Sequence, residues 1–270
     1  MEGTLIFNGS YRGSSFWEML QVDASHLLPD FTALAGDGSV QIPHGTTVLA
    51  FKYNDGVLVA GDRLATEGHR VASRDVQKVF ATDKYSLMAI SGAAGPCIEM
   101  ARILSVELEH YEKIEGERLE IEGKANKLSQ MIRQNLPAAM QGLVVVPLFA
   151  GYDLRRRTGR IWKFDITGGR YEETDFEATG SGGLYAHESL KKTWRSDLSK
   201  SEALRAAVGA LADASDEDRA TGGIDLTRRI FPIVKFCSEQ GMEDGSNEEM
   251  ESAYLKILER RANGNGGARA

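Results

Sequence analysis

The chain has 270 residues, of which 42% are hydrophobic and 26% are charged, and its net charge is −7. This is ordinary globular composition, with enough length for one sizeable core or two small ones. The acidic balance lacks the broad basic footprint of a nucleic-acid-binding protein. No apolar run approaches the roughly 18 residues of a membrane span, so we expect neither a nucleic acid nor a membrane as partner.

Cysteine and histidine usage argues against a disulfide framework and a metal centre. Cys97 and Cys237 form no C-x-x-C pair, and we expect both to be reduced core thiols. The histidines are scattered at no metal-ligand spacing, so we expect no metal and no cofactor, and a His-based triad is unsupported. They are His26, His44, His69, His110 and His187.

The first 45 residues differ from the rest of the chain in composition. They carry five acidic residues against one basic residue, Arg12, and scatter single large apolar residues among Gly, Ser and Asp. They lack the basic segment and the continuous apolar stretch of a signal peptide, and we expect a cytoplasmic protein. The composition fits a leader with a few docking side chains and equally fits an irregular arm of the domain.

From Thr46 onward the sequence predicts regular structure. Residues 46–53 are rich in β-formers, Asn54-Asp55-Gly56 is a strong hairpin signal, and residues 57–60 return as a second strand. Residues 80–91 are interpreted as two more short strands. The first part of the domain is therefore expected to consist of antiparallel hairpins.

Helical periodicity follows in two segments. The first helix has Gly95-Pro96 at its start, and Pro137 marks the end of the second. The apolar face of the first helix holds Ile98, Ala101, Leu104, Leu108 and Tyr111. The second helix carries Ala125, Leu128, Met131 and Ile132.

Strand patterns return in the second half of the chain and are interrupted by two further helices. The strand patterns cover residues 143–150, 160–166, 171–178 and 229–237. The helical patterns cover residues 184–194 and 199–215, and residues 248–261 could form a terminal helix. An acidic turn follows the last strand, and the Gly-rich residues 263–270 are expected to be disordered.

This order of elements predicts the fold class. Blocks of strands that alternate with pairs of helices indicate an α+β fold with antiparallel sheets and not a doubly wound parallel sheet. Two sheets, each covered by a helix pair, would give a four-layer αββα sandwich. We predict a leader over 1–45, one catalytic domain over 46–240 and a polar, partly disordered extension over 241–270.

The common catalytic motifs are absent, but one set of short motifs remains. No H-E-x-x-H, P-loop lysine or G-x-S-x-G occurs. The remaining motifs all lie at the ends of predicted strands or next to predicted helices. They are His44-Gly45-Thr46-Thr47-Val48, Gly61-Asp62-Arg63-Leu64-Ala65-Thr66, Gln77-Lys78-Val79-Phe80, Ser91-Gly92-Ala93-Ala94-Gly95, Gly180-Ser181-Gly182-Gly183 and Asp218-Arg219-Ala220-Thr221-Gly222-Gly223.

This combination resembles the proteasome β family of N-terminal nucleophile hydrolases, from Thr46 to about Cys237. Gly61 and Asp62 follow Thr46 by 15 and 16 residues, and Lys78 follows Asp62 by a further 16. No single motif is specific, but the whole set in register is. The resemblance implies the four-layer fold of this superfamily and a threonine peptidase that cuts itself between Gly45 and Thr46.

The chemistry of these residue types agrees with the resemblance. A threonine hydroxyl is a weak nucleophile that needs an adjacent base. Cleavage before Thr46 would free an α-amino group, whose reference pKa of about 7.7–8.0 lies close to working pH. Lys78 would make this amine less basic, and Asp62 would hold Lys78 in place. Taken alone, Asp62 and Lys78 would be better interpreted as an ordinary surface ion pair, and only the other motifs favour the catalytic role.

The resemblance also implies roles for further positions. Gly92 would supply a backbone N–H as oxyanion donor. Ser181, Asp218 and Thr221 match a supporting polar cluster, with threonine at 221 where the family often has serine. The implied substrate-binding positions are Ala65, Thr66, Val76, Phe80, Ile90, Ala94 and Ile98. All but Thr66 are apolar, so the pocket should accept a large apolar side chain, although Val76 and Ile90 could equally be core residues.

Three other interpretations are weighed against this one. The shorter bacterial homologue that works with a heat-shock ATPase has a very short leader and a smaller mature chain. A non-catalytic ring subunit would lack Thr46, Asp62 or Lys78, and all three are present. A metabolic amidase of the same superfamily is disfavoured only by the register of the motifs.

The leader, the acidic balance and residues 220–226 look most like actinobacterial β subunits. That placement implies as partners a homo-heptameric β ring stacked on a second β ring, proteasome α-subunit rings and a hexameric ATPase activator. The substrates would be unfolded proteins, marked by a small protein tag.

Overall fold

The structure, a computed structural model, describes residue 22, residues 45–67 and residues 70–265. Nearly all of the predicted leader, with its proposed docking side chains, therefore lies outside the described residues, as do His26, His44 and His69. Gly45 and Thr46, on either side of the predicted cleavage point, are both described.

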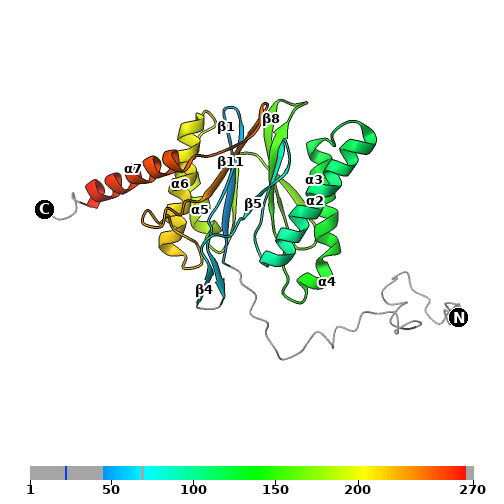
Figure 1. The fold of residues 1–270 in the computed structure, drawn as a ribbon, viewed down its shortest axis with the longest axis horizontal. Helices are drawn as coiled ribbons and strands as arrows, with labels where there is room; N and C mark the ends of the chain where they lie inside the picture. The colour runs from blue at the N-terminus through cyan, green and yellow to red at the C-terminus, as the bar shows by residue number, and fades with distance from the viewer. Residues whose placement is uncertain (1–21, 23–44, 68–69, 266–270) are drawn as a thin grey trace. The chain divides into compact units, whose positions relative to one another are not determined.

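Two antiparallel five-stranded sheets form the middle of the fold (Figure 1). In spatial order, the first sheet contains β10 (Phe176–Gly180), β1 (Thr47–Tyr53), β2 (Gly56–Gly61), β11 (Ile233–Ser238) and β12 (Gly241–Asp244). The second contains β5 (Val79–Asp83), β6 (Ser86–Ala89), β7 (Leu148–Asp153), β8 (Thr158–Phe164) and β9 (Arg170–Glu173). A separate hairpin consists of β3 (Ala65–Glu67) and β4 (Arg70–Ser73).

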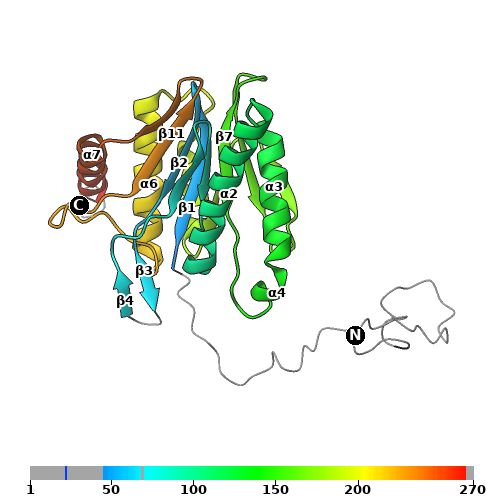
Figure 2. The same cartoon turned by 45° about the vertical axis from the view of Figure 1, so that its right-hand side comes forward.

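Helices cover the outer faces of both sheets (Figure 2). On the second sheet lie α2 (Ala94–Glu115) and α3 (Ile121–Gln134), followed by the short α4 (Leu136–Ala139). On the first sheet lie α5 (Gly183–Thr193) and α6 (Lys200–Glu217), and α7 (Asn247–Asn265) packs against α6. The predicted α+β fold, a four-layer αββα sandwich, is confirmed.

Three apolar clusters fill the three spaces between the four layers. In β1, Leu49 and Phe51 face α5 and α6, whereas Val48 and Ala50 face the second sheet. Successive side chains of a strand point to opposite faces, so a strand covered on both sides needs an unbroken apolar run. This explains why residues 46–53 predict a strand without showing polar alternation.

Three predicted strands differ from the structure. The strand predicted from 143 begins at Leu148, after Pro147, which has no N–H to donate to a ladder. The strand predicted from 229 begins at Ile233, again after a proline, Pro232. The segment predicted as one strand, 171–178, is split between the two sheets, because the chain crosses from β9 to β10. Hydrophobic period alone cannot reveal such a crossing.

The C-terminal segment continues the same fold. The predicted acidic turn after β11 contains β12, which pairs with β11. Met250 and Ala253 of α7 are buried in the cluster between the first sheet and its helices. The helix extends to Asn265, into the stretch expected to be disordered, and residues 266–270 lie outside the described residues. Among the helices that the structure describes, none is long and apolar enough to cross a membrane.

The helix patterns are confirmed in their main features. Ala101, Leu104 and Leu108 of α2 are buried as predicted, whereas Tyr111, near the end of the helix, is exposed. The Ser-x-Ser-Glu start of α6 forms a capping box, with Ser199 as N-cap and Glu202 bonding back to its backbone. Both predicted core thiols, Cys97 and Cys237, are buried and free.

Candidate active site

The residues singled out from the sequence gather where several elements begin or end at one edge of the sheets. In an antiparallel sheet the start of one strand lies beside the ends of its neighbours. The start of β1 accordingly lies between the ends of β2 and β10, with Val48 opposite Gly61 and Thr47 opposite Gly180. The flanking site residues are Thr46 before β1, Asp62 after β2, Lys78 before β5, Gly92 after β6, Ser181 after β10, and Asp218 and Thr221 after α6.

Lys78 and Asp62 form a buried ion pair. Lys78 is 2% exposed and Asp62 is 1% exposed, and Lys78 Nζ lies 2.7 Å from Asp62 Oδ1. The ammonium also donates to the carbonyl oxygens of Leu64 at 2.5 Å and Gly45 at 3.2 Å. This pair is therefore not the weak surface ion pair that the sequence alone left open.

Backbone groups hold the Asp62 carboxylate from three directions. Its Oδ1 accepts the N–H of Thr47 at 2.8 Å, and its Oδ2 accepts those of Leu64 at 2.9 Å and Gly222 at 2.8 Å. With Lys78 this makes four donors, which fill the roughly four acceptor sites of a carboxylate. Asp62 is consequently fixed and in turn fixes the lysine.

The local environment pulls the pKa of Lys78 in two directions. Burial lowers the pKa of its ammonium from the ordinary value, while the Asp62 carboxylate opposes that shift. All three N–H bonds of the ammonium have acceptors at Asp62, Leu64 and Gly45. The lysine thus presents a compact positive charge to the Gly45 carbonyl group.

Thr46 lies directly at the bond predicted to be cut. Its hydroxyl is 2.6 Å from the Gly45 carbonyl oxygen, the same oxygen that Lys78 approaches, and the residue is 6% exposed. The space around Gly45 requires a glycine. A Cβ there would lie only 2.7 Å from Thr66 Oγ1 and 2.8 Å from the Ala220 carbonyl oxygen.

Gly92 occupies a backbone position that other residues avoid. Its φ is +110°, and a Cβ would overlap the Val144 carbonyl oxygen. The residues on either side are hydrogen-bonded to the segment before β7: Ala93 N–H donates to the Val144 carbonyl oxygen, and Val146 N–H donates to that of Ser91. Within the described part of the chain, Gly92 N–H has no protein acceptor. Its geometry leaves this donor available for a bound oxygen.

The three polar residues assigned to a supporting cluster do lie together. Ser181 Oγ and Thr221 Oγ1 donate to Asp218 Oδ2 at 2.5 and 2.6 Å. The N–H of Ser181 donates to the Thr46 carbonyl oxygen at 2.8 Å, which joins the cluster to the candidate nucleophile. Thr221 provides the hydroxyl expected at this position.

The implied substrate-binding positions differ in how far their side chains are buried. Phe80 and Ile98 pack half-buried against the core cluster in which Ile90 is 3% exposed. Thr66, with its hydroxyl beside Gly45, lies on β3 next to Ala65. The remaining two, Val76 before β5 and Ala94 at the start of α2, are half-buried. Ile90 is thus placed as a core residue, whereas the others keep exposed surface.

Sequence reasoning missed Thr47, which contacts both halves of the site through Asp62 and Thr221. Its signal was the Thr-Thr doublet, but β-propensity explains a second threonine at the start of a strand equally well. It also missed Gly222, whose N–H holds Asp62.

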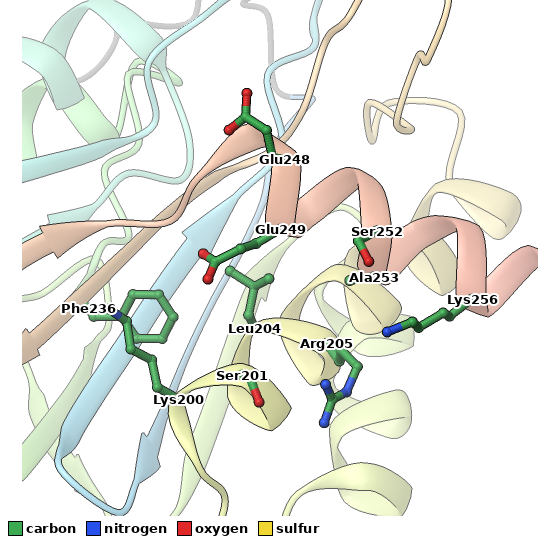
Figure 3. Close-up of a pocket in the computed structure, with 10 residues that line it drawn as sticks. All are labelled: Lys200, Ser201, Leu204, Arg205, Phe236, Glu248, Glu249, Ser252, Ala253 and Lys256. Atoms are coloured by element: carbon green, nitrogen blue, oxygen red, sulfur yellow. The ribbon is translucent and has the colours of Figure 1, made fainter.

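A pocket of about 430 Å³ between α6, β11 and α7 lies away from these residues (Figure 3). It is lined near the start of α6 by Lys200 and Leu204, whereas Asp218 follows the end of that helix. At 1.5 Å per residue, the length of α6 separates the pocket from Asp218 by about 25 Å. Among the described residues, no cluster of three or more His, Cys, Asp or Glu side chains could hold a metal ion.

The four layers, and a buried lysine–aspartate pair beside a threonine at the start of β1, define the fold of an N-terminal nucleophile hydrolase. The family model described as "Proteasome subunit" matches residues 42–226. A "Proteasome subunit beta" of Streptomyces griseus is 50% identical over 258 residues, covering 95% of this chain and 92% of the relative. One of Acidimicrobium ferrooxidans is 51% identical over 247 residues, covering 91% and 89%.

The chain therefore belongs to the proteasome subunit family. Its similarity to β-type members makes it a peptidase of the proteasome core, of the threonine endopeptidase class. The match to the Streptomyces griseus relative covers 95% of this chain and so extends into the first 45 residues, which disfavours the shorter bacterial homologue as an interpretation.

Proposed function

We propose that this chain is made as a precursor and cuts its own Gly45–Thr46 bond, which creates the nucleophile of a proteasome core peptidase. The observation that carries this proposal is the pair of contacts at the Gly45 carbonyl oxygen. The Thr46 hydroxyl lies 2.6 Å and the Lys78 ammonium 3.2 Å from it.

In the first reaction, Thr46 Oγ attacks the Gly45 carbonyl carbon, and the peptide bond breaks. The acyl group moves to Oγ as an ester, and the hydroxyl proton ends on the freed α-amine of Thr46. Negative charge develops on the Gly45 oxygen during the attack, and Lys78 stabilises it. Water then hydrolyses the ester and releases the leader, residues 1–45, with a carboxylate at Gly45.

In peptide cleavage, the freed α-amine of Thr46 is the base for its own hydroxyl. The attack on a substrate carbonyl gives an acyl-enzyme ester, which water hydrolyses. Gly92 N–H would bind the oxyanion, and Lys78, held by Asp62, would keep the amine from becoming too basic. Ser181, Asp218 and Thr221 would fix the backbone of Thr46.

The substrate preference follows from the apolar positions around the site. Phe80 and Ile98 keep part of their side chains exposed beside the second sheet, and Ala65, Val76 and Ala94 are small or branched apolar residues. We propose that this surface receives a large apolar side chain of the substrate, before the scissile bond. Thr66 on β3 would contact the substrate at the position that Gly45 occupies in the precursor.

The proposed assembly follows the resemblance to actinobacterial β subunits. A homo-heptameric β ring would stack on a second β ring between rings of α subunits, and a hexameric ATPase would feed unfolded, tagged proteins in the cytoplasm. The catalytic domain would comprise 46–240, and the C-terminal extension over 241–270 would add β12 to its first sheet and α7 to its helix layer.

Intact mass spectrometry of the assembled protein tests the proposed processing. The β chain in active particles should begin at Thr46, because only a free α-amine can act as the base. An unassembled chain should keep its leader. Fully active particles whose β chains all retain residues 1–45 would contradict the proposal.

Activity should depend on assembly. Ile103, Val106 and Ile114 of α2 are exposed apolar side chains, which suits a subunit that buries surface against partners. After separation by size, a short peptide with Tyr or Leu before a fluorogenic group should be cleaved only in fractions of several hundred kilodaltons. Full activity in the single-chain fraction would reject a chambered peptidase and favour the metabolic amidase.

A further inference from the structure

Thr47, the residue after the proposed nucleophile, is fully buried at the start of β1. Its backbone N–H and its hydroxyl are both hydrogen-bonded to residues of the site. Its N–H donates to Asp62 Oδ1 at 2.8 Å. Its hydroxyl oxygen lies 2.5 Å from Thr221 Oγ1 and accepts the N–H of Gly182 at 3.1 Å. Thr47 therefore joins the side of the site that holds Lys78 to the side that contains Asp218.

The partners of Thr221 determine the direction of the bond between the two threonine hydroxyls. Thr221 has one hydroxyl proton, and it donates that proton to Asp218 Oδ2 at 2.6 Å. Its oxygen must therefore accept the proton of Thr47. A one-way chain results, from Gly182 N–H through the hydroxyls of Thr47 and Thr221 to the Asp218 carboxylate. Such a chain, ending on a charge, strengthens each of its bonds.

This chain fixes the peptide group that carries the reactive end of Thr46. On one side, the Thr46 carbonyl oxygen accepts Ser181 N–H at 2.8 Å, with Ser181 Oγ 3.3 Å away. On the other side, Thr47 N–H is held by Asp62. Anchoring the Thr47 side chain further restrains the backbone along this stretch. With the backbone of Thr46 held, the direction of its Oγ depends on the few χ1 rotamers that a β-branched side chain allows.

Packing alone does not require a hydroxyl at this position. Valine has nearly the shape of threonine and is an equally good strand residue. A valine would, however, leave Thr221 Oγ1 without its donor and Gly182 N–H without its acceptor in a buried site. Gly182 approaches closely here, since a Cβ on it would come within 2.5 Å of Thr47 Oγ1.

We propose that the Thr47 hydroxyl is a positioning group of the peptidase, which aims Thr46 by tying its backbone to the Thr221–Asp218 pair. This inference rests on the proposed role of Thr46 as nucleophile. Thr47 touches no reacting atom, so its effect is on the geometry of the neighbouring residue.

The test compares Thr47→Val and Thr47→Ser in the fully assembled core particle, with the same short fluorogenic peptide. Loss of the hydroxyl should lower kcat per particle by about 10- to 100-fold, since small misplacements of a nucleophile have effects of this size. KM should stay within about twofold, because the substrate pocket is untouched. Serine keeps the hydroxyl and should keep kcat close to that of the unchanged protein.

Thr82→Val is the matched control. Thr82 is another buried strand threonine, 1% exposed, whose hydroxyl bonds to Ser86 at 2.8 Å, near the turn that follows β5. The Thr82→Val variant removes one hydroxyl of a buried pair that lies away from the site. The control should leave kcat per particle unchanged, even if particles become less heat-stable.

Equal kcat in the valine and serine variants would overturn the inference, and so would a rise in KM with kcat unchanged. If Thr47→Val gives no particles, Thr47→Ala against Thr47→Ser makes the same comparison of one oxygen atom. Failure of both hydroxyl-free variants to assemble would also overturn it, because Thr47 would then be a folding determinant. Thr46→Ala, measured in parallel, separates these outcomes: activity in that variant would refute the proposed nucleophile itself.

Discussion

Replacing Thr46 by alanine should abolish both removal of the leader and peptide cleavage, while particles still assemble. The variant has no hydroxyl to attack Gly45 or a substrate, and removal of a nucleophile typically lowers kcat by a factor on the order of 10⁴ to 10⁶. Among the residues that the structure describes, the lost hydroxyl hydrogen-bonds only to the Gly45 carbonyl oxygen, so the folded domain should lose no more than about 1 kcal/mol. Mass spectrometry would find the intact chain, and a fluorogenic peptide would report no turnover.

Two further variants make this result specific. Thr46→Ser keeps a hydroxyl and should retain measurable processing and cleavage. Thr82→Ala removes a buried hydroxyl in β5 and should behave as the unchanged protein in both assays. Normal turnover by Thr46→Ala particles would show that another group performs the attack.

The parts of the site that the sequence predicts are those that lie at the ends of strands. Thr46, Asp62 and Lys78 lie 16 residues apart along the chain, and each stands at the beginning or end of a strand. Antiparallel pairing of β1 with β2 brings Thr46 beside Asp62, and the packing of the second sheet on the first brings Lys78 to the same place. The spacing of the motifs therefore predicts that these residues lie close together in the fold. The catalytic role of each residue was predicted only from the family resemblance.

Other features depend on contacts that leave little trace in a single sequence. Strand propensity accounts for Thr47 whether or not its hydroxyl is used. The crossing between β9 and β10 occurs within a segment that has the composition of one strand. Ile90 and Phe80 are both apolar and close to the site in sequence, yet Ile90 is buried in the core and Phe80 keeps exposed surface. Burial and pairing distant in sequence decide these cases.

Replacing Lys78 should have an effect almost as large as replacing Thr46. Lys78→Ala removes the positive charge beside the Gly45 oxygen and leaves the Asp62 carboxylate buried without its ion partner. Breaking a buried pair in this way destabilises a protein by about 3–5 kcal/mol, so the alanine variant combines loss of chemistry with loss of stability. We expect neither leader removal nor peptide cleavage.

Lys124→Ala is a control for the stability component. Lys124 is 3% exposed and pairs with Asp83, at the other end of β5 from Lys78. At about 3.3 Å per residue this lies roughly 17 Å away, so this variant loses a comparable buried pair without touching the site. Particles that form with Lys124→Ala should process their leader and cleave peptide at the normal rate per site.

Lys78→Arg separates the charge of the lysine from its shape. The ammonium directs three N–H bonds to three different acceptors, the Asp62 carboxylate and the carbonyl oxygens of Leu64 and Gly45. A guanidinium is larger and planar, and it cannot place its donors on these three oxygens from the same buried point. We therefore expect processing and peptide cleavage to fail in the arginine variant, measured by intact mass and by fluorogenic turnover per assembled particle. Retained activity would mean that a positive charge suffices, and the geometric role assigned to Lys78 would be wrong.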